Sequence, residues 1–154
     1  MASAVAVQSI VVAADCETVF DRIISIAPDD FIRPRWPMPG VAAWSGAERW
    51  VAVGDQRRVT MTAGVTLTET LTAFDPPTGF SIRTTGFGGW FGALNDHCEI
   101  DWTVTPETDA ATKVVWRVAF FAKPGALAKA LLPRVVTPLW PPFMAVALER
   151  LRTG

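Results

Sequence analysis

Seven short segments with strand character follow one another between residues 41 and 122, and only short turns separate them. Within most of them apolar and polar residues alternate, as on a strand with one buried and one exposed face. We place these strands at 41–45, roughly 50–53, 56–62, 65–74, 80–87, 94–105 and 112–122. Because the connections are short, neighbouring strands are expected to pair antiparallel, as a meander.

The chain before this series has two further elements. Residues 4–12 are rich in Ala, Val and Ile and predict a first strand, and helical spacing predicts a short helix over about 15–26, with Asp15 near its start. The four prolines between Pro28 and Pro39 predict an irregular connection with at most one helical turn.

The last thirty residues change to helical spacing. A short helical run in "PGALAKALL" is expected to stop at Pro133, and an amphipathic helix is expected from Pro142 onward. The sequence therefore predicts an α+β fold in one domain, 1–154, in which about six or seven antiparallel strands wrap around a C-terminal helix. That helix is the only long apolar cover for the sheet, so a cavity is expected between them.

The charge balance narrows the possible partners. The 154 residues include 14 basic and 15 acidic side chains spread along the chain, with no basic stripe for nucleic acid and no support for a membrane surface. No apolar run approaches the roughly 20 residues of a membrane span. The apolar N-terminus has no basic residue before Arg22, so it is expected to be a strand and not a secretory signal, with the cytosol as the default location.

Metal and cofactor sites find little support in the sequence. The chain has one histidine, His97, and two widely spaced cysteines, Cys16 and Cys98, which form no zinc-binding spacing. His97 follows Asp96, but adjacent strand residues point to opposite faces, so a catalytic dyad is not expected. The stretch "GFGGWFG" fails the spacing of a phosphate-binding loop and predicts either a flap with Trp90 and Phe91 at its tip or a plain hairpin loop. We expect no metal and no cofactor.

One carboxylate interrupts the apolar face of the strand at 65–74. Val65, Leu67 and Leu71 share that face, and Glu69 lies in the middle of it. In the preceding strand Arg57 interrupts the apolar face in the same way. These two residues are the only charged ones on the two apolar faces.

The register of these two strands decides whether the two charges meet. A three-residue loop, 62–64, places Gly64 where a positive φ is wanted and pairs Arg57 with Glu69 and Val59 with Leu67. A two-residue turn would pair Arg58 with Glu69 and mix the two faces, so the apolar pattern favours the first register. We expect Arg57 within salt-bridge reach of Glu69. The pair either closes the cavity wall without binding anything or serves as the polar anchor of a ligand.

Large apolar side chains on the inward strand faces and on the C-terminal helix complete the expected ligand site. Seven tryptophans in a chain of this length favour an aromatic-rich core that is partly a cavity lining. With Arg57 and Glu69, the candidate ligand-binding residues are Val59, Leu67, Ile82, Trp90, Cys98, Trp102, Trp116, Phe120, Phe143 and Ala147.

An ordered set of motifs runs over nearly the whole chain: "AADCETVFDRI", "WPMPGV", "VGDQRRV", "TETLTAFDPPTGFSI", "DWTVTP", "TKVVWRVAFFAKP" and "ALERLR". In this order they resemble the START/Bet v 1-like (SRPBCC) superfamily, in its polyketide cyclase/dehydrase-like branch. The resemblance implies a helix-grip fold with an internal pocket for a hydrophobic small molecule. It does not settle activity, and because this chain has no tyrosine, a tyrosine-based cyclase mechanism cannot be carried over.

Three functions remain open. The first is binding of a hydrophobic polyketide-, lipid- or aromatic-like molecule without chemistry. The second is a cyclase or dehydratase in which Glu69 is the general acid or base, with Arg57 expected to hold it ionised. The third is a protein-interaction module, or a homodimer face, built from Trp36, Trp44 and Trp50.

Overall fold

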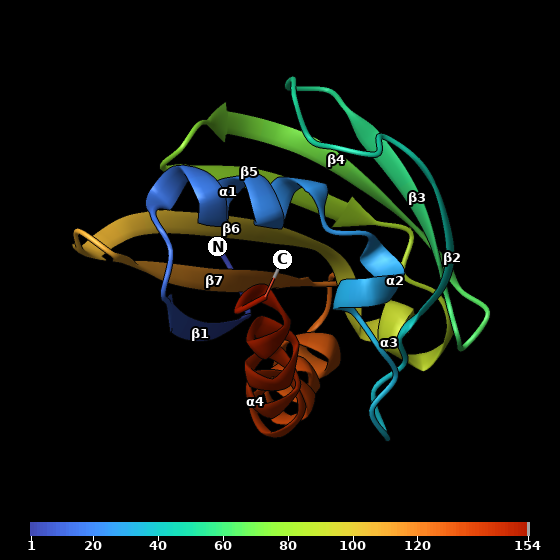
Figure 1. The fold of residues 1–154 in the computed structure, drawn as a ribbon. Helices are drawn as coiled ribbons and strands as arrows, with labels where there is room; N and C mark the ends of the chain where they lie inside the picture. The colour runs from blue at the N-terminus through green and yellow to red at the C-terminus, as the bar shows by residue number, and fades with distance from the viewer. Residues whose placement is uncertain (154) are drawn as a thin grey trace.

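Seven strands form one antiparallel sheet in the order β1-β7-β6-β5-β4-β3-β2. The computed structural model describes residues 1–153. The strands are β1 (Ala4–Val12), β2 (Val41–Gly46), β3 (Gln56–Met61), β4 (Thr66–Asp75), β5 (Gly79–Thr85), β6 (Asn95–Thr108) and β7 (Ala111–Ala122). The predicted meander from β2 to β7 is confirmed, and β1 returns to pair with β7. The sheet is strongly curved, and its helices lie on the concave side (Figure 1).

Four helices and one 3-10 turn accompany the sheet: α1 (Cys16–Ser25), α2 (Pro28–Phe31), α3 (Gly89–Leu94), α4 (Ala126–Leu148) and η1 (Glu149–Leu151). The expected first helix is confirmed, and the Asp15 carboxylate caps it by accepting the backbone N–H of Thr18 at 2.8 Å. The N–H donation lowers the pKa of Asp15. The glycine-rich stretch expected as a flap or hairpin loop forms the short helix α3 instead.

Two strand predictions need correction. The segment expected as a strand at 50–53 is a turn, in which the Asp55 carboxylate accepts the N–H groups of Val51 and Ala52 at 2.9 and 3.0 Å. This local bonding satisfies the backbone without a neighbouring strand. In β4 the register shifts between Leu71 and Ala73, so Ala73, expected to point inward, is exposed.

The two C-terminal helices expected from the sequence are one continuous helix, α4, with Pro133, Pro138, Pro141 and Pro142 inside it. Each proline removes the N–H that would bond the carbonyl four residues earlier. Those carbonyls belong to exposed residues: Lys129, Arg134, Thr137 and Pro138. Water can hydrogen-bond to these carbonyl groups, while the opposite face of the helix packs inward, so helical structure persists through the prolines.

One helix, from Ala126 to Leu151, is long and apolar enough to cross a membrane by length and composition alone. This corrects the expectation that no segment approaches such a length. Only 33% of its most apolar stretch is buried in the protein. The buried residues belong mainly to its C-terminal half, including Phe143, Met144, Ala147 and Leu148. A helix that covers a sheet in a folded domain has the same composition.

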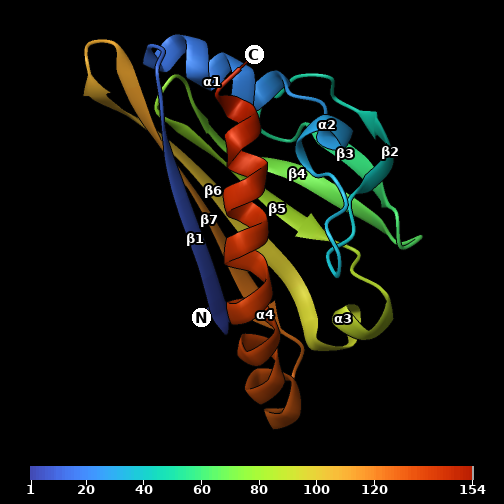
Figure 2. The same ribbon diagram turned by 60° about the horizontal axis from the view of Figure 1, so that its bottom comes forward.

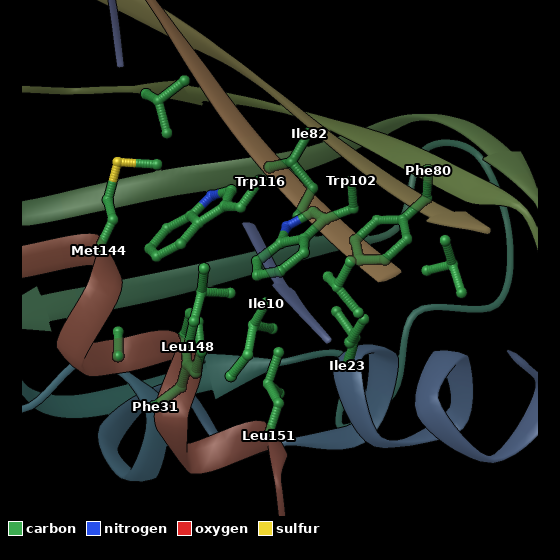
Figure 3. Packing of buried hydrophobic residues seen from close by; sticks show 14 of the residues in the cluster. Ile10, Ile23, Phe31, Phe80, Ile82, Trp102, Trp116, Met144, Leu148 and Leu151 are labelled. Atoms are coloured by element: carbon green, nitrogen blue, oxygen red, sulfur yellow. The ribbon is translucent and has the colours of Figure 1, made fainter. Parts of the chain in front are cut away.

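The packed core lies at one end of the concave face. There α4 contacts β1 and β7, and α1 closes the end of the sheet near the C-terminus of α4 (Figure 2). Met144, Leu148 and Leu151 face Trp116, Trp102 and Ile10 across this core, with Ile23 and Phe31 beside them (Figure 3). Toward β2–β5 the sheet curves away from α4, so one helix cannot fill the whole concave side.

The continuous helix generates a prediction for Pro138. Replacing Pro138 by Ala restores a backbone donor in the middle of α4 and is expected to raise the free energy of unfolding by about 2 kcal/mol, measured by urea denaturation. Pro124, which precedes the helix, is the matched control, and Pro124→Ala is expected to lower stability by less than about 1 kcal/mol. A neutral Pro138→Ala would instead indicate that the helix is broken there, as the sequence pattern suggested.

Candidate functional site

A cavity of about 810 Å³ lies between the inner face of β3–β7 and the helices α2, α3 and α4. This volume falls in the range of small-molecule sites, and most of the lining side chains are apolar or aromatic. Trp36 and Trp90 line the cavity yet are 94% and 65% exposed, so the cavity reaches the surface between the loop 32–40 and α3. We call this opening the mouth.

The predicted pairing of β3 with β4 is confirmed. Arg57 pairs with Glu69 and Val59 with Leu67, and Gly64 has a φ of +91° in the connecting loop. The Met61 N–H donates to the Val65 carbonyl at 2.8 Å and closes that loop. The register therefore follows from apolar alternation together with a glycine at the one loop position that requires a left-handed backbone.

A row of facing residues continues from this pair across the sheet. Glu69 pairs with Thr84 of β5, Thr84 with Cys98 of β6, and Cys98 with Phe120 of β7. All of them line the cavity, and the row becomes less polar toward β7. We call Arg57, Glu69 and Thr84 the polar row.

Arg57 does not form the salt bridge expected from the sequence. Its side chain is 5% exposed, and it donates from Nε to the Ala47 carbonyl at 2.7 Å and from Nη2 to the Glu48 carbonyl at 3.2 Å. The guanidinium lies over Trp50 at 4.4 Å and near Trp44 at 5.4 Å from the ring centroids. None of the ion pairs within residues 1–153 joins Arg57 to Glu69, so no nitrogen of Arg57 lies within 4.0 Å of the Glu69 carboxylate.

Glu69 is therefore the more available member of the pair. Its side chain is half-buried and lines the cavity, and within the described chain its carboxylate takes part in no hydrogen bond. Burial raises the pKa of Glu69, and the nearby charge of Arg57 opposes this only in part. Arg57 thus lowers the pKa of Glu69 as expected, but desolvation is the larger effect, so the net shift is upward. Burial likewise lowers the pKa of Arg57, opposed by Glu69.

Three buried polar atoms have no hydrogen-bond partner within residues 1–153: the Thr84 hydroxyl, the Asn95 amide oxygen and the Trp116 indole N–H. Thr84 and Trp116 line the cavity. Buried polar groups in folded proteins are nearly always paired, so these two atoms indicate groups that a bound molecule or water can satisfy. Sequence reasoning did not single out Thr84, although alternation from Ile82 would have placed it on the inner face.

Stacked aromatic rings form the floor and one wall of the cavity. Trp102 and Trp116 stack with centroids 5.0 Å apart at 7°, and Phe31 of α2 packs on both. On the α4 side Trp140 stacks on Phe91 of α3, also at 5.0 Å. Trp140 and Phe91 were not among the residues expected to line the ligand site. Sequence reasoning placed a helix break before Pro142 and a flap at 86–92.

The structure brings together most of the residues expected at the ligand site. Ala147 is the exception. It is a fully buried residue of α4 that packs in the core and does not line the cavity. The others all line the cavity: Arg57, Val59, Leu67, Glu69, Ile82, Trp90, Cys98, Trp102, Trp116, Phe120 and Phe143.

Two other reactive side chains within residues 1–153 are Cys98, which lines the cavity, and His97, which does not. Burial raises the pKa of the Cys98 thiol to about 12, so it is not a thiolate at neutral pH. His97 lies outside the cavity, where its ring stacks on Phe121. Contrary to expectation, its Nδ1 contacts the Asp96 carboxylate at 2.8 Å, because the strand is irregular between Asn95 and His97. Residues 1–153 contain no group of three or more His, Cys, Asp or Glu arranged for a metal ion.

The three tryptophans of the interaction hypothesis do not form one patch. Trp50 is buried beneath Arg57, and Trp44 is half-buried with its indole N–H donating to Asp29 at 3.1 Å. Only Trp36 is fully exposed. This removes the combined apolar face on which that hypothesis depended.

Comparisons with solved structures support the fold. The chain is similar to the Zhui aromatase/cyclase from Streptomyces sp. R1128 (TM-score 0.67, 15% identity, covering 96% of this chain and 90% of that one). It is similar to Ara h 8.0201 (TM-score 0.63, 15% identity, 97% and 98% covered). A solution structure from Arthrobacter aurescens also matches (TM-score 0.65, 12% identity, 97% and 84% covered). At these identities the likeness shows the Bet v 1-like helix-grip fold alone.

No curated protein sequence matches this chain. A family described as polyketide cyclase/dehydrase and lipid transport matches residues 3–153, which is nearly the whole chain. Together with the helix-grip fold and the internal cavity, this match shows that the chain belongs to the polyketide cyclase/dehydrase and lipid transport family.

Proposed function

We propose that the protein binds a hydrophobic small molecule in the cavity and that Glu69 and Thr84 supply its polar contacts. The observation that carries this proposal is a large apolar cavity containing two adjacent polar side chains without protein partners. Facing residues on neighbouring strands have Cβ atoms about 5 Å apart, so one ligand group can reach both. Membership of a family that includes lipid transport supports the same class of ligand.

The polar row favours a neutral hydroxylated ligand over a carboxylate. An ionised Glu69 accepts hydrogen bonds only, and the Thr84 hydroxyl can donate or accept. A ligand hydroxyl can donate to Glu69 and accept from Thr84, whereas a ligand carboxylate would meet a like charge. The donors of Arg57, which could have bound a carboxylate, are directed to the carbonyls of Ala47 and Glu48.

A matched pair of ligands tests this preference. We expect 2-naphthol to bind more tightly than 2-naphthoate at pH 8, measured by isothermal titration calorimetry. Glu69→Gln is expected to weaken naphthol binding about tenfold or more, because a hydrogen bond to a charged group is lost. Val59→Leu, a change elsewhere in the same lining, controls for altered packing. Tighter binding of naphthoate to the wild-type protein would contradict the assigned polarity.

The pH dependence of stability tests the environment of Glu69 separately from any ligand. A carboxyl whose folded-state pKa is raised stabilises the fold below its ordinary pKa, and that contribution is lost as the pH rises through the raised value. Glu69→Gln removes the titrating group. The variant is therefore expected to gain stability relative to wild type as the pH rises above the ordinary range of glutamate. A difference that does not vary with pH would show that Glu69 is well solvated.

Arg57 is assigned a structural role, because its donors hold the loop before β3 and its charge stacks on buried Trp50. Arg57→Ala is expected to lower the free energy of unfolding by about 3 kcal/mol. The carbonyls of Ala47 and Glu48 lose their hydrogen-bond donors, and the Glu69 carboxyl loses the nearby positive charge. Arg58, exposed on the opposite face of the same strand, is the matched control, and Arg58→Ala is expected to stay within about 0.5 kcal/mol. Equal effects of the two substitutions would contradict this assignment.

A second candidate function is a cyclase or dehydratase reaction with Glu69 as general acid. The raised pKa of Glu69 and its position in the cavity favour this role, and the similar Zhui protein is an aromatase/cyclase. Protonated Glu69 would donate its proton to a leaving hydroxyl group, so kcat/KM is expected to fall as the pH rises through that pKa. Glu69→Gln is expected to lower kcat by about a hundredfold or more. Turnover that survives this substitution would leave binding as the function.

A further inference from the structure

Four segments near the mouth contribute to the cavity lining: residues 33–39, 62–65, 86–94, and 123–140, of which only Leu139 and Trp140 line it. We call them the mouth rim. The segment 123–140 comprises the start of α4 and the residues before it, which lie with α3 at the end of the molecule opposite α1 (Figure 2). A molecule that enters through the mouth passes between Trp36 and Trp90.

The mouth rim is basic although the chain as a whole is not. It contains five basic residues and no acidic one: Arg33, Arg35, Lys123, Lys129 and Arg134. The rest of the chain contains the other nine of the 14 basic residues and all 15 acidic residues. Arg33 and Arg35 are exposed, and neither forms an ion pair with a described acidic side chain. Lys123 forms an ion pair with Asp96 of β6, at 3.5 Å.

The same rim exposes large apolar side chains beside these charges. Trp36 follows Arg35 directly and is the most exposed tryptophan at 94%, and Trp90 lies on α3 of the rim. Leu127 at the start of α4 is 72% exposed. Tryptophan favours the interface between membrane and water, and basic side chains favour anionic lipid headgroups. Both kinds of side chain are exposed at the mouth, where Trp36 follows Arg35.

We propose that the mouth rim docks on an anionic lipid bilayer, with Trp36 and Trp90 in the interfacial layer and Arg33 and Arg35 against lipid phosphates. In this orientation the cavity opens toward the bilayer, so a hydrophobic ligand can pass between them without crossing water. The even charge balance of the sequence argued against a membrane role. The fold changes that conclusion for one surface, because Arg33 and Arg35 are exposed beside Trp36, which lines the cavity at the mouth.

An anionic bilayer fits the rim better than an acidic protein does. The apolar groups are single exposed side chains: Trp36 is 94% exposed, Leu127 is 72% exposed, and Trp90 is 65% exposed although its ring contacts Phe91. Shallow insertion needs exposed side chains of this kind, with basic residues close by, and does not need a shaped partner surface. A protein interface of standard size would need a larger complementary area.

Vesicle co-sedimentation of the full chain tests the proposal. Wild-type protein is expected to bind vesicles of phosphatidylcholine with phosphatidylglycerol at least about tenfold more tightly than pure phosphatidylcholine, and salt should weaken this binding. The double variant Arg33→Glu/Arg35→Glu is expected to lose about 25-fold or more, at about fivefold for each basic residue removed from an anionic surface. Trp36→Ser should weaken binding to both kinds of vesicle, because it removes the inserted group.

A charge-matched variant provides the control. Arg58→Glu/Arg83→Glu makes the same change in net charge at two exposed positions outside the mouth rim and should lose much less. Circular dichroism and thermal unfolding establish that each variant folds. The proposal is wrong if wild type binds both kinds of vesicle equally or if the two double variants lose equally. It is also wrong if Arg33→Glu/Arg35→Glu binds vesicles normally but no longer binds an acidic carrier protein. None of these results depends on the identity of the cavity ligand.

Discussion

The concave face of a seven-stranded sheet is wider than one helix can cover, and this mismatch organises the molecule. Apolar residues on that face must leave water, so α4 packs against β1 and β7 and α1 closes one end. Beyond the end that α1 covers, the helices do not fill the space over β3–β6, and the cavity remains there. Its aromatic walls limit the space but do not close it.

The polar row shows what an apolar cavity requires when charged groups lie within it. An arginine in such a place needs partners for its donors, and it finds them in the carbonyls of the segment before β3 and in the face of Trp50. Glu69 is left with the charge of Arg57 nearby but no direct bond. The row is nearly balanced in charge, yet the group that a ligand can reach is the carboxyl. This asymmetry gives the cavity its polarity.

Sequence reasoning predicted much of what depends on near neighbours along the chain, although it missed the turn at 50–53. The meander follows from alternation and short turns, and the register of β3 with β4 follows from Gly64 and the two apolar faces. The family resemblance predicted the fold as a whole, including the cavity. Nearly all the residues expected at the ligand site line that cavity, because alternation assigns each strand residue to one face.

What could not be predicted depends on contacts between distant segments. The direction of the Arg57 side chain is set by carbonyls in the 46–50 segment and by Trp50, whose turn was expected to be a strand. Four prolines argued for a break in the last helix, but the freed carbonyls face water and packing maintains the helix. The mouth could not be predicted either, because it lies between the loop 32–40 and α3, which are distant in the sequence.

The central claim is that the cavity is a ligand site and not merely a packing defect. Native mass spectrometry of the full chain, incubated with lipid and metabolite extracts, tests this most directly. The account predicts a one-to-one complex with an apolar molecule, which disappears when Leu67→Trp fills the cavity while the fold is retained. A wild-type protein that captures nothing from any extract, or a Leu67→Trp variant that captures the same molecule, would contradict it.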